Sequence, residues 1–232
     1  MYHSISNSID YTYMATPLNL FEKQMDYLHR NHYSIISAYD LVEIMMTRKS
    51  FPERAVVISF DDGFRDNLLT VQVLKKYKFP AIFFIAVEKM DKDPQFLSWH
   101  EVQYLSNHSL FSIGSHTFTH PLLKNLSNEK LICEISFSKQ YIEDHIGKPV
   151  YFFAYPFGGY GSYDDRTVSL VRSSGYCGAF STISGTNMLD QDRYQLRRTR
   201  ISWFDDEDEF PKAMQGGYDW YHLWQRLESF AQ

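Results

Sequence analysis

The stretch Ser59-Phe60-Asp61-Asp62-Gly63 decides how this sequence is interpreted. It follows the apolar run Ala55-Val56-Val57-Ile58, so two adjacent carboxylates stand at the end of a predicted buried strand. Buried carboxylates are costly unless a metal ion or a cation compensates their charge, or unless one of them is catalytic. The sequence offers a metal site downstream, because Gly114-Ser115-His116-Thr117-Phe118-Thr119-His120 follows another short apolar segment.

The composition suits a single domain, residues 1–232, of the α/β class with a large core. The formal net charge is −5 and there is no long basic run, which argues against nucleic acid as a partner. Aromatic residues make up 17% of the chain. They either pack the core or line a cleft for sugar rings, and the composition leaves both readings open.

Targeting signals are not visible in the sequence. No segment approaches the roughly 18 consecutive apolar residues of a transmembrane helix. Residues Met1–Ile5 lack the charged and then apolar pattern of a signal peptide. The expectation is therefore a cytoplasmic protein, although a processed or truncated chain would look the same.

Apolar runs alternate with helical patterns along most of the chain. Strands are predicted at 34–36, 55–60, 80–86, 110–114, 150–157, 177–181 and 197–203, and helices at 17–31, 38–46, 64–77, 99–106, 127–147 and 164–174. This alternation predicts right-handed crossovers and a parallel sheet. In a barrel of this kind the carboxyl ends of the strands carry the chemistry, and the polar motifs follow predicted strands.

His116 and His120 are four residues apart, which on a helical turn would place both imidazoles on one face. Together with one strand-end aspartate they would form a three-ligand metal site with open positions for water and substrate. Zn²⁺ fits this ligand set best, and Co²⁺, Ni²⁺ or Fe²⁺ are also compatible. The second aspartate would then accept a proton from water. The alternative for Asp61-Asp62-Gly63 is a simple strand-to-turn cap.

Three motifs resemble a known family in their order and spacing. They are residues 59–63, residues 115–120 and Ala154-Tyr155-Pro156-Phe157-Gly158. They look like the first three motifs of the polysaccharide deacetylases, carbohydrate esterase family 4, which share the nodulation-factor deacetylase homology domain. The resemblance covers roughly residues 1–203. It implies a distorted (β/α)7-type barrel and metal-dependent hydrolysis of N-acetyl groups on amino sugars.

The resemblance also implies roles for individual residues. Asp61 would be the general base, and the metal ligands would be Asp62, His116 and His120. Pro156 would shape its loop so that the backbone N–H of Phe157 holds the oxyanion. Tyr155, Pro156 and Trp99 are expected to contribute to substrate binding, although Trp99 could instead pack against the protein.

Two departures from the family pattern point to substitutes. Many members of the family have an arginine that orients the base aspartate, at the position where this chain has Ala154. Arg198 is the candidate replacement for that arginine. The alternative is that Arg198 simply belongs to a basic edge strand. The common C-terminal Leu-x-His acid motif is missing, since His222 is the only histidine after residue 200. In the biofilm poly-N-acetylglucosamine deacetylases the acid histidine lies in an N-terminal Tyr-His, and Tyr2-His3 of this chain resembles that motif. His3 is therefore expected to protonate the leaving amine, the alternative being a surface histidine near a frayed terminus.

The last segment, about 206–232, has a heavily aromatic face. Its large apolar residues are Tyr218, Trp220, Tyr221, Leu223, Trp224, Leu227 and Phe230. It could dock a partner protein or a membrane surface, or pack as a helix on its own barrel. The acidic run at 205–209 is expected to be a solvated helix start.

The resulting hypothesis is a hydrolase that releases acetate from an N-acetylated polysaccharide, oligosaccharide or glycolipid. One alternative is a hydrolase of a small amide or ureide on the same fold. Another is a carbohydrate-binding protein with a vestigial site. The sequence leaves the exact substrate, the native metal and the oligomeric state open.

Overall fold

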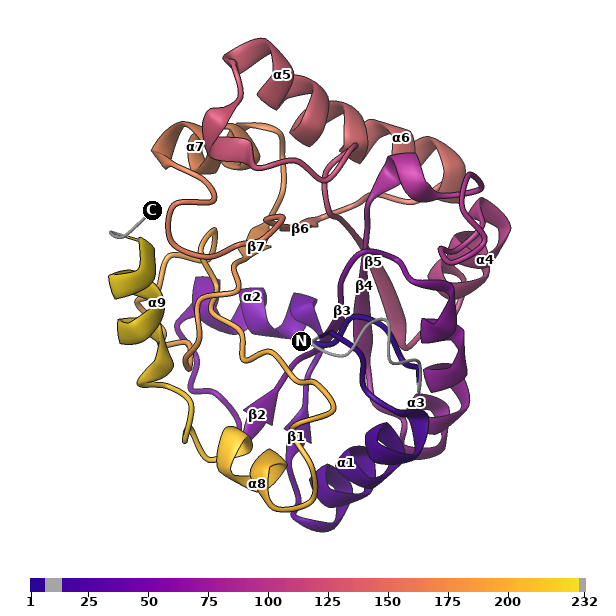
Figure 1. Cartoon of the computed structure of the whole chain (residues 1–232), viewed down its shortest axis with the longest axis vertical. Helices are drawn as coiled ribbons and strands as arrows, with labels where there is room; N and C mark the ends of the chain where they lie inside the picture. The colour runs from indigo at the N-terminus through magenta and orange to yellow at the C-terminus, as the bar shows by residue number, and fades with distance from the viewer. Residues whose placement is uncertain (7–13, 230–232) are drawn as a thin grey trace.

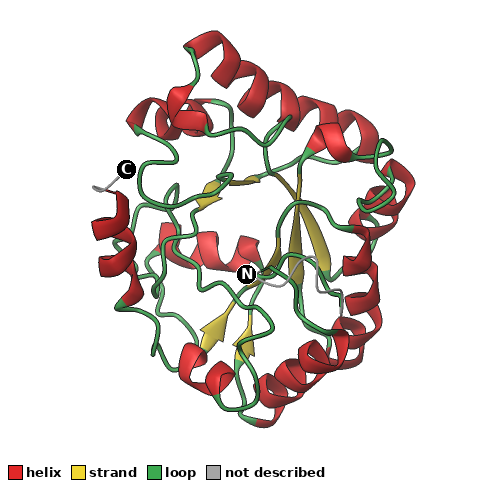
Figure 2. Cartoon of the chain, in the orientation of Figure 1, coloured by secondary structure: helices red, strands yellow, loops and turns green. Residues whose placement is uncertain are grey.

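A five-stranded parallel sheet forms the centre of the protein. The computed structural model describes residues 1–6 and 14–229. The strands lie in the order β3 (Ile58–Phe60), β4 (Ala81–Ile85), β5 (Phe111–Ser115), β6 (Phe152–Ala154) and β7 (Gly178–Phe180). All neighbouring strands are parallel. Helices surround this sheet (Figures 1 and 2), which explains why β4 is buried along its whole length.

Two irregular segments close the sheet into a barrel. Tyr2 N–H donates to the Ser59 carbonyl at 2.8 Å, and Asp61 N–H donates to the Tyr2 carbonyl at 2.9 Å. On its other side the N-terminal segment accepts a hydrogen bond from Ile201 N–H at the Met1 carbonyl. Leu196 in turn bridges to Phe180 of β7. The five strands and these two segments together form the wall of the barrel. The structure therefore has the expected distorted (β/α)7-type form.

The helical layer follows the predicted alternation. It contains α1 (Leu18–Arg30), the 3-10 helix η2 (Arg65–Thr70) with α3 (Val71–Tyr77), α4 (Trp99–Ser106), α5 (Asn128–Ile132), the π-helical turn η5 (Cys133–Phe137), α6 (Ser138–Ile146) and α7 (Asp165–Ser173). Short 3-10 turns lie at η3 (Val87–Lys89) and η4 (Leu123–Asn125). Two further strands, β1 (Ser34–Ile35) and β2 (Ala55–Val56), form a separate parallel pair. In the chain α2 (Ala38–Thr47) lies between them.

The structure corrects several of the predicted elements. The predicted strand at 55–60 is interrupted at Val57, so β2 pairs with β1 whereas β3 joins the barrel sheet. The predicted strand at 197–203 is irregular. The predicted helix at 127–147 has the expected ends, but a π-helical turn interrupts it. The acidic run is not simply solvated, because the buried carboxylate of Asp205 accepts the Ser202 N–H.

Aromatic side chains fill much of the core. Phe60 and Phe83 stack on neighbouring strands with ring centroids 4.8 Å apart. Gly114 allows β4 and β5 to pack closely, since a Cβ there would meet the Phe84 ring at 2.4 Å. Of the two readings of the aromatic content, core packing therefore accounts for many of these residues.

The C-terminal segment contains α8 (Glu209–Met214), at the bottom of Figure 1, and α9 (Tyr221–Ser229), at its left. Gln225 ties α9 to the barrel by donating to the Thr182 carbonyl and accepting from Ser184 N–H. Large side chains nevertheless face outward at Trp220, Leu223, Trp224 and Leu227. Docking through this face remains a prediction, and Phe230 lies outside the described residues. Within the described ranges, no helix has the length and apolarity needed to span a membrane.

Candidate active site

Asp61 and Asp62 lie at the carboxyl end of β3, and both are nearly inaccessible, with 1% and 5% of their surface exposed. The backbone turns sharply here, because Asp62 and Gly63 both have left-handed conformations, with φ of 71° and 78°. A Cβ on Gly63 would come within 3.0 Å of the Met90 side chain. The Asp-Asp-Gly sequence thus provides a turn that buries two carboxylates side by side.

Asp62, His116 and His120 form a candidate metal centre. Asp62 Oδ1 lies 3.5 Å from His116 Nε2 and 3.2 Å from His120 Nε2. One ligand atom from each residue lies within 4.8 Å of the others. Asp62 Oδ1 is buried and accepts no hydrogen bond, as expected of an oxygen that awaits a cation. Two imidazoles and one carboxylate are a donor set that suits Zn²⁺.

The second nitrogen of His116 fixes its orientation. His116 Nδ1–H donates to the Ala154 carbonyl at 2.7 Å, which leaves Nε2 as the ligand atom. Burial lowers the pKa of His116 to about 4, against the opposing influence of Asp61 and Asp62. The imidazole is therefore neutral at physiological pH, as a metal ligand must be.

The sequence-based expectation that His116 and His120 share a helical turn is wrong. They lie on a loop that follows β5, in which Thr117 and His120 have φ of 70° and 60°. Positive φ at such residues costs about 1–3 kcal/mol each and persists only where surrounding contacts enforce it. His120 comes close to His116, with ring centroids 4.9 Å apart, because of this loop conformation and not because of helical spacing.

Asp61 is held by Arg198, a residue 137 positions away in the sequence. The guanidinium donates from Nη1 to Oδ1 and from Nη2 to Oδ2, both at 2.7 Å, and its Nε–H donates to the Ser181 carbonyl. Burial opposes ionisation of Asp61, but Arg198 and His116 outweigh it and lower the pKa of the carboxyl. Asp61 is therefore an oriented carboxylate with its own counter-charge.

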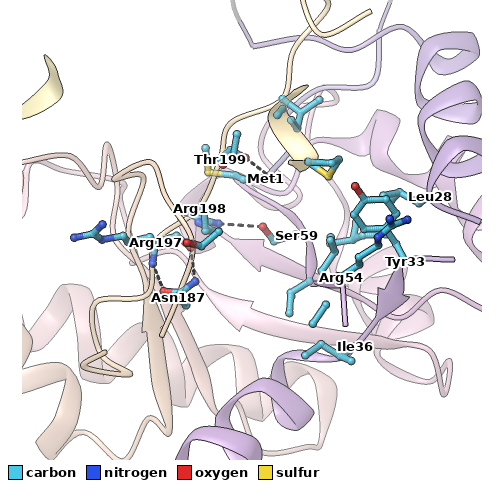
Figure 3. A pocket seen from close by; sticks show the side chains of 18 of the residues that line it. Met1, Leu28, Tyr33, Ile36, Arg54, Ser59, Asn187, Arg197, Arg198 and Thr199 are labelled. Carbon is cyan, nitrogen blue, oxygen red and sulfur yellow. Dashed lines mark hydrogen bonds between the residues drawn. The ribbon is translucent and has the colours of Figure 1, made fainter. Parts of the chain in front are cut away.

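A cavity of about 400 Å³ lies against the same arginine (Figure 3). Its wall includes Met1, Ser59, Arg198 and Thr199, and Figure 3 shows the hydrogen bond between Arg198 and Ser59. Asp61 and the three candidate ligands do not line it. The cavity is therefore distinct from the candidate active site, although both share Arg198.

His3 is buried, and Asp61 is close enough to act on its charge, so the alternative of a surface histidine near a frayed terminus is wrong. The N-terminal segment pairs with β3 through Tyr2, and Asn67 Nδ2–H donates to the His3 carbonyl at 2.6 Å. Within the described chain His3 Nδ1 is buried without a hydrogen-bond partner. Burial lowers the pKa of His3, whereas Asp61 and Asp62 act in the opposite direction.

Phe157 lies in the turn after β6, beside one of the candidate metal ligands. Its ring lies 5.2 Å from the His120 ring, and 58% of its surface is exposed. Phe157 and Gly158 both have φ near 60°. A Cβ on Gly158 would lie 2.8 Å from the Thr182 backbone nitrogen, so the turn requires glycine there. The turn therefore brings the Phe157 ring next to His120 of the candidate metal centre.

The structure places the side chains of Tyr155 and Pro156 in the core and that of Trp99 against its neighbours in the helical layer. Tyr155 is fully buried, stacks on Tyr163 and donates its hydroxyl hydrogen to the Tyr194 carbonyl, so its side chain packs the core and cannot contact substrate. Pro156 is also buried. Trp99 stacks on His145 of α6, with ring centroids 4.1 Å apart, in the helical layer.

Trp203 and Phe204 are exposed aromatic residues that the sequence-based reasoning overlooked. Their ring centroids are 4.0 Å apart, and 42% and 53% of their surfaces are exposed. They follow the segment in which Ile201 pairs with Met1, and they therefore lie at the carboxyl end of that segment. Asp205 anchors their turn by accepting the Ser202 N–H at 2.8 Å. The signal was present as two adjacent aromatic residues at the end of a predicted strand.

Comparisons with known proteins agree with this geometry. A Bacillus subtilis protein, YxkH, named for the polysaccharide deacetylases, is 31% identical over 204 residues, which cover 87% of this chain and 70% of YxkH. The poly-β-1,6-N-acetyl-D-glucosamine N-deacetylase of Escherichia coli K12 is 22% identical over 161 residues, 62% of this chain and 24% of that protein. The name of this second relative agrees with the predicted resemblance to poly-N-acetylglucosamine deacetylases.

A solved structure extends the likeness to the whole fold. BA0330 of Bacillus anthracis, also named for the polysaccharide deacetylases, superposes with a TM-score of 0.80 at 26% identity, covering 92% of this chain and 67% of that one. Residues 48–179, more than half of the chain, match the family described as polysaccharide deacetylase. The chain belongs to the polysaccharide deacetylase family.

Proposed function

We propose that this protein is a metal-dependent hydrolase that removes N-acetyl groups from amino sugars and releases acetate. The observation that carries the proposal is the pairing of a candidate metal centre with a second carboxylate, Asp61, that is held separately by Arg198. Membership of the family supports deacetylation. We further propose that residues 1–203 carry the activity and that 206–232 is an appended segment of the same domain.

The reaction assigned to the site is hydrolysis of an acetamide. Asp62, His116 and His120 would hold a divalent ion, and Zn²⁺ bound there would supply a Lewis acid that polarises the substrate carbonyl and acidifies water. Asp61 takes the proton of the attacking water while the water oxygen bonds to the carbonyl carbon. Arg198 keeps Asp61 ionised and aimed during this step.

Collapse of the tetrahedral adduct breaks the carbon–nitrogen bond. The backbone N–H of Phe157 donates to the oxygen that gains negative charge. His3 gives a proton to the departing nitrogen, so that a free amine and acetate leave the site. Asp61 returns its proton to His3 or to solvent, which restores the starting state.

An amino-sugar chain is the substrate class that we favour over a small amide or ureide. The E. coli relative is named for an N-acetylglucosamine polymer. The exposed pair Trp203–Phe204 and the exposed Phe157 ring at the rim suit the flat faces of sugar rings. We assign these exposed rings to sugar units beyond the one that reacts.

A comparison of substrates tests this choice. We expect acetate release from N-acetylglucosamine oligomers to exceed release from a small N-alkylacetamide, and Trp203→Ala to raise KM for oligomers with little change for the small amide. Trp220→Ala, which removes an exposed tryptophan from the C-terminal segment, is the matched control. Equal rates for both substrates, with no effect of Trp203→Ala, would favour the small-amide alternative.

A second experiment tests whether the site is catalytic at all. Asp61→Asn should abolish acetate release while zinc still binds, because the introduced amide is not a base and Asp62, His116 and His120 remain. Full activity in this variant would remove Asp61 from its assigned role. Wild-type protein that binds sugar oligomers but neither takes up zinc nor releases acetate would favour a vestigial, carbohydrate-binding site.

A further inference from the structure

The loop that carries His120 has a conformation that its own sequence does not favour. Thr117, a β-branched residue, has φ of 70°, and His120 has φ of 60°. Between them, the N–H groups of Phe118 and Thr119 point to a single acceptor. The geometry of the metal-binding loop therefore depends on the group that accepts these bonds.

That acceptor is the carboxylate of Glu134. Its Oε2 accepts Phe118 N–H at 2.9 Å and Thr119 N–H at 2.8 Å, and its Oε1 accepts the Thr119 hydroxyl at 2.7 Å. Only 8% of Glu134 is exposed. Among residues 1–6 and 14–229 no ion pair with Glu134 is present, so the three donors are what compensates its buried charge.

Glu134 reaches the loop from the π-helical turn η5, which interrupts the helix between α5 and α6. These helices cross the upper part of the molecule in Figure 1. Ile135, next in the turn, is fully buried, and Ser138 at the start of α6 hydrogen-bonds Ser115 of β5 at 2.8 Å. The turn is thus fixed against the strand that leads into His116. Single π-helical turns of this kind are frequent at functional sites.

Other hydrogen bonds hold the rest of the loop, but they do not involve the N–H groups that Glu134 accepts. Thr117 and Phe118 carbonyls accept N–H groups of Val87 and Glu88, and His120 N–H donates to the Thr117 hydroxyl at 3.0 Å. These bonds hold one edge of the loop. Glu134 holds the opposite set, the amides of the two residues directly before His120.

We propose that Glu134 is a positioning residue for the metal centre, which fixes the loop so that His120 Nε2 faces Asp62. This inference rests on the proposed function, since it assigns Glu134 to the same metal site. Glu134 touches neither metal nor substrate in this role. It acts by keeping the loop between Thr117 and His120 in its strained conformation, so that the third ligand is in place before the ion binds.

The test is zinc affinity of Glu134→Gln, measured by competition with a chromogenic chelator. Glutamine keeps the size of the side chain, but its amide group cannot accept all three donors. We expect zinc to bind roughly 10–100-fold more weakly than to the wild type. The d–d absorption spectrum of the Co²⁺-loaded variant should also change, because it reports the ligand geometry directly. Glu129→Gln, an exposed position on α5 with the same change of charge, should leave both readouts unchanged.

A milder variant guards against simple misfolding. Thr119→Ala removes one of the three donors, and we expect a smaller loss of zinc affinity in the same direction. Combined with Glu134→Gln it should add little, because both changes remove the same contact. Zinc affinity and Co²⁺ spectrum that stay at wild-type values in folded Glu134→Gln would overturn the inference and leave the proposed function standing. Wild-type protein that binds no zinc would overturn both.

Discussion

Asp61 and Asp62 are neighbours in the sequence, but the fold gives them different partners. Asp61 is bound by the guanidinium of Arg198, whereas Asp62 faces the imidazoles of His116 and His120. Burial alone would raise the pKa of the Asp62 carboxyl, but the neighbouring histidines outweigh it and hold that pKa below its ordinary value. Two carboxylates can therefore stay ionised at adjacent positions and serve different purposes.

Arg198 is expected to be essential for turnover without being needed for metal binding. Arg198→Met would leave Asp61 buried beside an apolar group, and breaking such a pair costs about 3–5 kcal/mol, enough to favour the protonated carboxyl. We expect kcat/KM to fall by at least about 100-fold. Arg200→Met, at an exposed position two residues on, is the control. Acetate release and zinc content are measured together, and unchanged turnover in Arg198→Met would contradict the assignment.

His3 is expected to matter only when the leaving group needs a proton. His3→Gln should reduce hydrolysis of N-acetylglucosamine oligomers by about 10²–10⁴-fold, the usual contribution of a general acid. Hydrolysis of an aryl acetate ester should fall much less, because a phenolate leaves without protonation. The two rates are measured on the same preparation. An equal loss on both substrates would indicate that His3 supports the barrel and does not act as the acid.

At the scale of the elements, one glycine sets how closely two strands approach. A Cβ at position 114 would lie 2.4 Å from the Phe84 ring and 3.0 Å from the Phe152 carbonyl oxygen. Gly114→Ala should therefore destabilise the protein by about 1–3 kcal/mol, as overpacking of a core does. At Gly159 the nearest atoms would be 3.9 Å away, so Gly159→Ala should have little effect. Urea denaturation measures both, and equal stabilities would show that β4 and β5 can separate at no cost.

The start of α7 should respond to pH through its cap. Asp164 accepts the Thr167 N–H at 3.0 Å. Burial raises the pKa of Asp164, but this N–H and Arg166 outweigh it, so the pKa lies below its ordinary 3.8. The stabilisation is therefore present above pH 3.8 and is lost as the pH falls through the lower folded-state value. We expect Asp164→Ala to cost about 1 kcal/mol at neutral pH and less in acid.

The matching variant for this cap is Asp164→Asn. Asparagine is an equally good cap and does not titrate, so its stability should stay near that of the wild type at neutral pH. Thermal melting of the three proteins across the acid range gives the comparison. A constant difference between Asp164→Ala and the wild type down to the most acidic sample would show that the carboxylate charge contributes nothing.

The sequence predicted most elements because hydrophobic periodicity reports which faces are buried. It did not reveal the break at Val57, since periodicity does not say with which sheet a strand pairs. It also suggested a helical turn for His116 and His120, because positive φ at Thr117 and His120 leaves no mark in the sequence. At the site, the motifs identified residues but not their orientation. Tyr155 therefore belongs to the core, although its motif belongs to the site.

At the scale of the whole molecule, closure of the barrel assembles the site from both ends of the chain. The N-terminal segment lies between β3 and the segment around Ile201, as the hydrogen bonds of Met1 and Tyr2 show. This arrangement brings His3, Asp61 and Arg198 together from three distant parts of the sequence. Contacts over such separations are visible only once the fold is known, which is why the sequence could suggest the partner of Asp61 but could not establish it.

Binding of zinc should stabilise the whole protein, because the candidate centre joins the ends of β3 and β5. An ion that binds only the folded state at 1,000 times its Kd adds about 4 kcal/mol. For a chain of 232 residues, this corresponds to a rise in Tm of roughly 8–16 °C. Chelator-treated protein is melted with and without zinc. His100→Ala, which removes an exposed histidine, should keep the full shift, whereas Asp62→Asn should lose most of it. A zinc-dependent rise in Asp62→Asn as large as that of the wild type would mean that the ion binds somewhere other than Asp62, His116 and His120.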